Sequence, residues 1–255
     1  MMGTSWDPEL YLRFDDHRAR PFFDLLARIG ATAPRRVVDL GCGPGQLTTV
    51  LSRRWPAATV EALDSSPEMV EAARGRGVAA ELGDVRQWLP AADTDVVVTN
   101  AVLQWVPGHT ALLHRWLTAL PAGAWFGMQV PGNHRSPSHT LARELTEEPR
   151  WRGAVALGEE DPVAEPVEYA QLFAGAGAEV DVWETTYTHR LTGADPVLAW
   201  ICATVLRPVR DALDDAGWAA FRAELAPRLR TAYPMQADGT TWFPFRRIFA
   251  VARRG

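Results

Sequence analysis

A run of alternating glycines directly after a short apolar segment constrains this chain most. Residues 37–40 predict a buried strand, and the sequence Gly-Cys-Gly-Pro-Gly follows at 41–45. Glycine permits sharp backbone turns and lets main-chain amides approach a ligand closely. Residues 46–55 predict a helix. A strand, a glycine loop and a helix in this order are typical of a nucleotide-type pocket.

The next predicted strand, at 59–63, ends in the acidic residue Asp64, which Ser65 follows. A carboxylate at this place can accept hydrogen bonds from both hydroxyls of a ribose. We therefore expect Asp64 to bind the sugar of the nucleotide, and we include Ser65 among the cofactor-binding residues.

The identity of the nucleotide depends on how the glycines are spaced. A dinucleotide fingerprint has glycines at its first, third and sixth places. Here Gly41 and Gly43 fill the first and third places, but Gln46 stands at the sixth and Gly45 at the fifth. Pro44 also removes an amide that could otherwise bind a phosphate.

Asp39, inside the same motif, would repel a pyrophosphate but suits an ammonium group. S-adenosylmethionine carries a ribose, an adenine and an amino-acid tail, and it has no phosphate. The pattern therefore favours S-adenosylmethionine. A nicotinamide or flavin nucleotide and a structural turn without a ligand stay open as alternatives.

Two further positions follow predicted strands. Asp84 and Val85 come after the strand at 78–82, where the carboxylate could accept a hydrogen bond from the adenine amino group and the Val85 amide could face a ring nitrogen. Asp84 could instead serve as a helix cap or a turn residue. Asn100 follows the apolar strand at 95–99, at the carboxyl edge of the sheet, where ligands of such folds bind.

Length and charge limit the classes of function. A chain of 255 residues can hold one α/β domain with an elaboration. The net charge of −5 argues against a nucleic-acid partner, since proteins that bind nucleic acid usually have a basic surface.

The two cysteines, Cys42 and Cys202, indicate buried thiols in a reducing compartment, and no spacing of Cys or His residues suggests a metal site. With neither a signal peptide nor a membrane span in the sequence, we expect a cytoplasmic protein.

Strand and helix patterns alternate along the first half, which predicts a parallel sheet with right-handed crossovers. We treat the chain as a single domain, 1–255, with an N-terminal helical lid at 1–30 and an inserted helical cap at 191–241. The expected helices lie at 21–29, 46–55, 67–74, 109–120, 137–148, 166–175, 195–206 and 214–232. The expected strands lie at 37–40, 59–63, 78–82, 95–99, 124–130, 179–188 and 245–252.

The pattern Asp-x-Gly-x-Gly-x-Gly at 39–45 resembles motif I of class I methyltransferases. More specific stretches look like the trans-aconitate methyltransferase family, and the similarity runs nearly end to end. These stretches are 6–14, 18–21, 63–69, 99–107, 182–187, 200–201, 206–208 and 245–249. The resemblance implies a Rossmann-like, mostly parallel seven-stranded sheet with helices on both faces and an inserted helical cap. Residues 150–165 match less well.

The family resemblance also implies a reaction: transfer of a methyl group from S-adenosylmethionine to a carboxylate of trans-aconitate, giving a monomethyl ester. A carboxylate is ionised at pH 7, so it can attack without a general base. We therefore expect no catalytic acid or base, including His134 and His189, and catalysis by positioning and desolvation.

Binding a tricarboxylate requires cations and hydrogen-bond donors, and arginine suits planar carboxylates. In the matching segments we expect Arg207 and Arg246 to bind the substrate in a cavity above Asn100 and Trp105. Arg20 is the candidate for the cofactor carboxylate. Gln104, Trp105 and Tyr187 could add donors and a wall.

Two alternatives to this function stay open. The chain could methylate another small acid or a natural product with the same fold and cap. It could instead be an S-adenosylmethionine-binding regulator without turnover, because a cofactor motif does not prove catalysis. The oligomeric state is not determined by the sequence.

Overall fold

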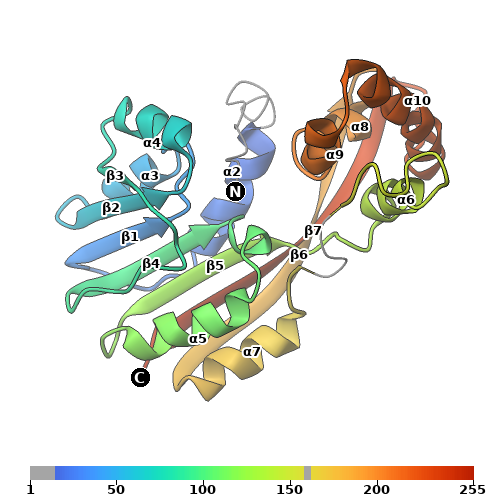
Figure 1. Ribbon diagram of the computed structural model, residues 1–255. Coiled ribbons are helices and arrows are strands. Elements are labelled where there is room, and N and C mark those ends of the chain that lie inside the picture. Colours follow the sequence, from blue (N-terminus) through green and yellow to red (C-terminus); the bar gives the residue numbers. More distant parts are fainter. Residues whose placement is uncertain (1–14, 158–161) are drawn as a thin grey trace. The chain divides into compact units, whose positions relative to one another are not determined.

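The computed structural model describes residues 15–157 and 162–255 and contains one seven-stranded sheet with strand order β3-β2-β1-β4-β5-β7-β6 (Figure 1). The strands are β1 Arg36–Leu40, β2 Thr59–Asp64, β3 Ala80–Leu82, β4 Thr94–Asn100, β5 Trp125–Pro131, β6 Ala178–Thr192 and β7 Thr240–Arg254. β1 to β5 pair in parallel, and β7 pairs with β5 antiparallel. This confirms the predicted α/β fold with a mostly parallel seven-stranded sheet.

The helices are α2 Asp15–Leu26, α3 Thr48–Arg54, α4 Pro67–Arg74, α5 His109–Ala119, α6 Pro137–Thr146, α7 Pro166–Gly175, α8 Pro196–Cys202, α9 Arg207–Ala212 and α10 Asp215–Ala232, with a short 3-10 helix η1 at Leu103–Trp105. α4 and α7 have the predicted bounds. α2 begins six residues before the predicted start at Pro21, which lies inside the helix. Neither α9 nor η1 was expected as a separate element.

The residues divide into two compact units. The sheet unit comprises residues up to 131, 163–184 and 247–255, and the helical unit comprises 132–162 and 185–246. β6 and β7 contribute residues to both. The helical unit contains the predicted cap at 191–241 and also takes in α6; the role of this part as a substrate cap stays a prediction.

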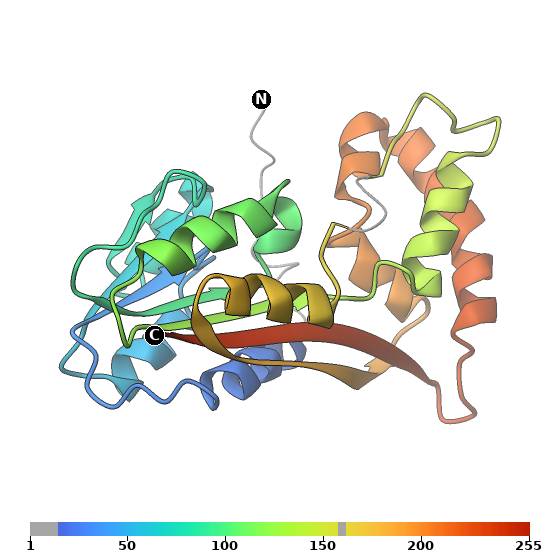
Figure 2. The same cartoon turned by 90° about the horizontal axis from the view of Figure 1, so that it is seen from below.

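In the sheet unit, helices cover both faces of the sheet (Figures 1 and 2). Side chains alternate between the two faces along each strand, which assigns residues to one face or the other. Val97 and Phe126 pack with residues of α5 and α7 in one buried cluster. On the opposite face, a side chain at Gly127 would meet Leu25 and Ile29, so the segment 25–29 lies directly against β5. Because β4 pairs Val97 with Phe126 and Val98 with Gly127, these two faces extend across both strands.

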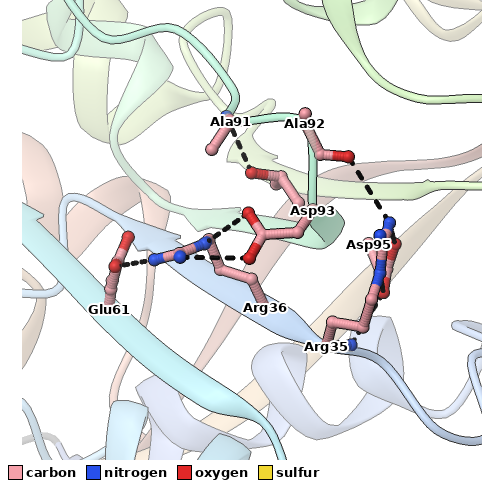
Figure 3. A network of polar contacts seen from close by, with 8 residues as sticks. Arg35, Arg36, Glu61, Ala91, Ala92, Asp93 and Asp95 are labelled. Carbon is pink, nitrogen blue, oxygen red and sulfur yellow. Dashed lines mark hydrogen bonds and ion pairs between the residues drawn. The ribbon is translucent and has the colours of Figure 1, made fainter.

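The amino ends of β1 and β4 carry a cluster of ion pairs (Figure 3). Arg36 binds both oxygens of Asp93, at 2.9 and 3.1 Å, and also contacts Glu61. Arg35 binds both oxygens of Asp95, at 2.9 and 2.7 Å. Hydrogen bonds from these arginines lower the pKa of Asp93 and of Asp95. Both arginines at this edge are therefore paired within the protein.

The core of the helical unit is aromatic. His189 is buried and stacks on Trp200, with ring centroids 4.9 Å apart, while Trp200 meets Phe243 and Phe245 at 5.6 Å each. α10 packs against α6 and α8. No helix within the described ranges is long and apolar enough to cross a membrane.

Candidate active site at the carboxyl edge of the sheet

Asp39 is a buried carboxylate at the end of β1. Its Oδ2 accepts a hydrogen bond of 2.6 Å from the hydroxyl of Thr48, the first residue of α3. Burial raises the pKa of Asp39 to about 6, the Thr48 bond opposes this shift, and nearby Asp64 adds to it. A buried anion in this position is stabilised by a cation, as the ammonium hypothesis requires.

The glycine loop uses its own amides. Gly41 and Cys42 both donate to the Leu63 carbonyl, at 2.7 and 3.0 Å, and Gly45 donates to the Cys42 carbonyl at 3.2 Å. Gly43 donates to Asp64, and Pro44 has no N–H to offer. A phosphate-binding loop turns its amides toward the ligand, whereas every amide of 41–45 is bonded within the protein. The loop therefore fits a ligand without phosphate better than a dinucleotide.

Asp64 ends β2 with both carboxylate oxygens held by backbone amides. Oδ2 accepts from Gly43 at 2.8 Å, and Oδ1 accepts from Ser66 at 2.9 Å. Each carboxylate oxygen has capacity for a second hydrogen bond, so this fixed group can still accept two ribose hydroxyls. Ser65 is exposed, while Ser66 is buried and caps α4 by accepting from the Met69 amide.

The three loop glycines have different tasks. All three have positive φ angles, of 79° at Gly41, 54° at Gly43 and 82° at Gly45. A Cβ at Gly41 would lie 2.2 Å from Val102, and one at Gly45 would lie 2.8 Å from Ala73. At Gly43 no atom of the described residues lies within 4 Å of that position. Gly41 and Gly45 therefore serve close packing, and Gly43 faces open space where a ligand can approach.

Asp84 and Val85 follow β3, as the adenine hypothesis requires, but Asp84 also has a neighbour that the sequence did not suggest. Arg86 binds both oxygens of Asp84, and this hydrogen bonding lowers its pKa. Asp84 thus stays an anion with part of its accepting capacity already used. Val85 is buried. Their contact with adenine remains a prediction.

A strained turn follows β4. Ala101 has a φ of 58°, and its amide donates to the Gln129 carbonyl at 2.8 Å. The Gln104 side chain donates to the Ala101 carbonyl at 2.7 Å, which supports the turn. The buried atoms Gln104 Oε1 and Asn100 Oδ1 meet no hydrogen-bond partner among the residues that the structure describes. A positive φ at a residue other than glycine is strained, and such strain occurs at functional sites. Gln104 Oε1 and Asn100 Oδ1 can each accept a hydrogen bond from a ligand or interact with a cation.

Strand register places a row of polar side chains on one face of the sheet, near the carboxyl ends. Asp39 pairs with Ala62 on β2 and with Val98 on β4, so Asp64 and Asn100, each two residues further, share its face. Gln129 pairs with Asn100 and continues the row on β5. Arg247, at the start of the β7 segment in this unit, donates to Gln129 Oε1 at 3.0 Å. The row runs from carboxylates through amides to a guanidinium.

The remaining predicted site residues lie in several places. Trp105 is 49% exposed at the end of η1. Arg20 is exposed on α2, with its guanidinium 4.0 Å from Asp24. Tyr187, Arg207 and Arg246 belong to the helical unit, where burial lowers the pKa of Arg207 and Arg246 donates to the Gly132 carbonyl at 3.3 Å. Their predicted roles toward cofactor and substrate stay predictions.

Sequence reasoning missed Thr48, Gln129 and Arg247. Each has a signal in hindsight, because a polar residue in an otherwise apolar strand or at the first turn after a glycine loop needs a partner. Gln129 stands between Met128 and Val130, and both flanking residues are fully buried. The pairing of Gln129 with Arg247 joins residues 118 positions apart, which no local pattern indicates.

These residues fit a phosphate-free nucleoside with a cationic tail. Asp64 can accept the ribose hydroxyls, and Asp39 and Asn100 offer acceptors toward an ammonium. Cys42 adds no competing nucleophile, because burial raises the pKa of its thiol far above neutral pH. The set matches S-adenosylmethionine in its donors and acceptors.

Comparison with known proteins agrees with this geometry. Residues 14–181 match the family model described as a methyltransferase domain. The chain is 61% identical to a trans-aconitate 2-methyltransferase of Mycobacterium sp. (strain KMS), covering 98% of this chain and 100% of the relative. It is 59% identical to the protein of the same name from Rhodococcus jostii (strain RHA1), covering 97% and 99%.

Among solved structures, the YcgJ protein of Bacillus subtilis aligns with a TM-score of 0.59 at 13% identity, over 92% of this chain and 98% of that one. At this identity the likeness shows the fold. The family model and the near full-length identity show more: the chain belongs to the trans-aconitate 2-methyltransferase family of methyltransferases.

Proposed function

We propose that this protein transfers the methyl group of S-adenosylmethionine to one carboxylate of trans-aconitate, giving the monomethyl ester. The observation that carries the substrate is the 61% identity to a trans-aconitate 2-methyltransferase over 98% of the chain, a span that includes the helical unit. The bonded loop amides and the two carboxylates of the site support the cofactor.

In this proposal the residues of the chain bind the cofactor and orient its methyl group. Asp64, fixed by two backbone amides, holds the ribose, and Asp39 with Asn100 favours the ammonium end. Gly41, Gly43 and Gly45 shape the loop beneath it, and Ser65, Asp84, Val85 and Arg20 complete the cofactor set that we propose. When bound, S-adenosylmethionine supplies a methyl group on a positively charged sulfur, which an anionic oxygen can attack.

No proton needs to move in this reaction, because the nucleophile is already a carboxylate at neutral pH. The protein therefore contributes alignment and exclusion of water. We propose that Arg207, Arg246, Tyr187, Gln104 and Trp105 bind the acid. Arginine is suited to this because its planar fork can bind both oxygens of a carboxylate.

A panel assay tests the proposal. Labelled methyl transfer should be fastest with trans-aconitate among di- and tricarboxylic acids. Faster transfer to another small acid or natural product would replace the substrate, and cofactor binding without transfer to any acid would favour a regulator.

The pH dependence tests the chemistry. The maximal rate should not follow a histidine ionisation between about pH 6 and 9. His134→Asn and His189→Asn should keep the rate within about tenfold of the wild type. A loss of several orders of magnitude in a folded variant would indicate a hydroxyl or phenol nucleophile that needs a base.

We also propose a cytoplasmic location and a small molecule, in place of nucleic acid, as the partner. The net charge of −5 supports the second point, since it disfavours a phosphate backbone. Cell fractionation and a nucleic-acid binding assay at low salt test these two statements.

A further inference from the structure

Gln129 and Arg247 form a buried polar pair at the carboxyl edge of the sheet. Gln129 is fully buried on β5, and Arg247 is 4% exposed on β7. Arg247 Nη1 donates to Gln129 Oε1 over 3.0 Å. Neither residue was among the site residues predicted from the sequence, and neither has been given a role toward cofactor or substrate.

The bond to Arg247 determines the orientation of the Gln129 amide. A guanidinium can only donate, so the atom that faces it must be the amide oxygen. The Nε2 group therefore points elsewhere, and this buried donor has no hydrogen-bond partner within the described part of the chain. A buried donor without an acceptor is costly, so an acceptor from a ligand would satisfy it.

The pair lies where the substrate is expected. Gln129 is the register partner of Asn100, which ends β4 at the cofactor edge. Asn100 Oδ1 is an acceptor, whereas Gln129 Nε2 is a donor. Adjacent strands thus offer opposite chemistry: an acceptor toward the cationic cofactor and a donor toward an anionic acid.

We propose that Gln129 Nε2 and the Arg247 guanidinium bind one carboxylate of the acid, and that this is the carboxylate that anchors the substrate and is not methylated. The inference rests on the proposed function. A carboxylate that accepts charge-assisted hydrogen bonds is stabilised as an anion and is a weaker nucleophile, so the pair suits anchoring. The Gln129–Arg247 pair thereby selects acids that carry a second carboxylate in addition to the one that is methylated.

The sharpest variant is Gln129→Glu. The new carboxylate would pair with Arg247 in place of the substrate, which keeps the fold and fills the subsite. We expect KM for trans-aconitate to rise about 30-fold or more, with kcat within about threefold and cofactor affinity within about twofold. A purely structural role predicts an intact fold with unchanged KM.

Two further variants and a control complete the test. Gln129→Met removes the donor and should raise KM about tenfold, and Arg247→Gln should raise it further. The rise should be smaller for a dicarboxylic acid that lacks the anchoring group. Arg36→Gln is the matched control, because this strand arginine is paired with Asp93 and Glu61 at the opposite edge (Figure 3). Its KM should equal that of the wild type.

The outcomes separate the two hypotheses. If wild-type protein methylates no polycarboxylic acid, the proposed function fails. If the wild type is active and folded Gln129→Glu keeps its KM within twofold, the anchoring inference is wrong. Should the variants not fold, nuclear magnetic resonance of the wild type decides: on adding trans-aconitate to the S-adenosylhomocysteine complex, the Gln129 side-chain amide signal must shift, and an unshifted signal overturns the inference.

Discussion

The two halves of the carboxyl edge of the sheet differ in their hydrogen-bonding groups: one half offers acceptors and the other offers donors. On β1 and β2, Asp39 and Asp64 present oxygens, held by the Thr48 hydroxyl and by backbone amides. On β5 and β7, Gln129 and Arg247 present donors. Asn100 lies between them on β4. Although the net charge is −5, the acceptor half is suited to a cationic ligand and the donor half to an anionic one, because local groups decide what each half attracts.

The difference extends to how the halves are held. Asp64 is fixed by the amide of Ser66, two residues further along, and by the amide of Gly43 in the loop after the neighbouring strand β1. Arg247 reaches Gln129 through antiparallel pairing of β7 with β5. The acceptor half is therefore built within one short segment, from β1 to the start of α4, and the donor half from the pairing of strands 118 residues apart in sequence at Gln129 and Arg247. Four predictions test this contrast.

The largest effect is expected in the packing of the acceptor half, at Gly41. In Gly41→Ala, the new Cβ would lie 2.2 Å from Val102 in a backbone with positive φ, so the free energy of unfolding should fall by about 3 kcal/mol or more. Gly43→Ala is the matched variant. With no described atom within 4 Å, it should lose only about 1 kcal/mol of stability but weaken cofactor binding. Equal stability losses in denaturant titrations would contradict this division.

The second prediction concerns pH and Asp39. Burial raises its pKa to about 6, above the value of about 3.9 for an unfolded carboxyl group. The folded state binds the Asp39 proton more tightly than the unfolded state does. The protonated carboxyl group therefore contributes its full stabilisation below about pH 4, and this contribution is lost as the pH rises through about 6. Asp39→Asn cannot ionise and should gain about 2–3 kcal/mol relative to the wild type between pH 4 and 7.

Cofactor binding should depend on the same ionisation of Asp39, but with the opposite sign to folding stability. An ammonium favours the ionised form of Asp39, so calorimetry should find weaker S-adenosylmethionine binding as the pH falls below about 6. The Asp39→Asn variant serves as the control and should lack this dependence. Parallel affinity curves for the two proteins would show that Asp39 does not interact with the cationic end.

The third prediction is that variants of the acceptor half change the affinity for the cofactor, whereas variants of the donor half change KM for the acid. Asp64→Ala removes the acceptor for two ribose hydroxyls, and the affinity for S-adenosylmethionine should fall by about 1.5–3 kcal/mol. With cofactor at saturation, KM for the acid should change little, whereas variants of Gln129 should show the reverse pattern. A variant in one half that alters both constants equally would break the division between the halves.

The smallest effect is expected at the amino edge. Arg36→Gln removes ion pairs at a partly exposed site, where the side-chain exposure is 23% for Arg36 and 42% for Asp93. Pairs that solvent can reach contribute little to stability. The melting temperature should fall by no more than about 4 °C, and both ligand affinities should be unchanged. A large drop in activity would mean that charge far from the carboxyl edge influences the site.

Local patterns in the sequence predicted much of the acceptor half. The helices α4 and α7 have the predicted bounds, and the parallel pairing of β1 to β5 agrees with the prediction from alternating strands and helices. Gly43 and Asp64 meet because the parallel pairing of β1 with β2 brings the loop after β1 to the end of β2. The role of these residues toward a cofactor stays a prediction. Local patterns did not indicate that Ser66, next to Ser65, is the buried serine that caps α4, or that Arg86 binds Asp84.

The sequence by itself therefore determined the α/β class, the glycine loop and the carboxylates around it, because these depend on short-range turns and on the period of apolar residues. The tertiary structure decided the donor half. Only the pairing of β5 with β7 brings Gln129 and Arg247 within 3.0 Å, and only their burial reveals a donor in need of an acceptor. Contacts between distant strands depend on the packing of the whole sheet, which no local pattern specifies.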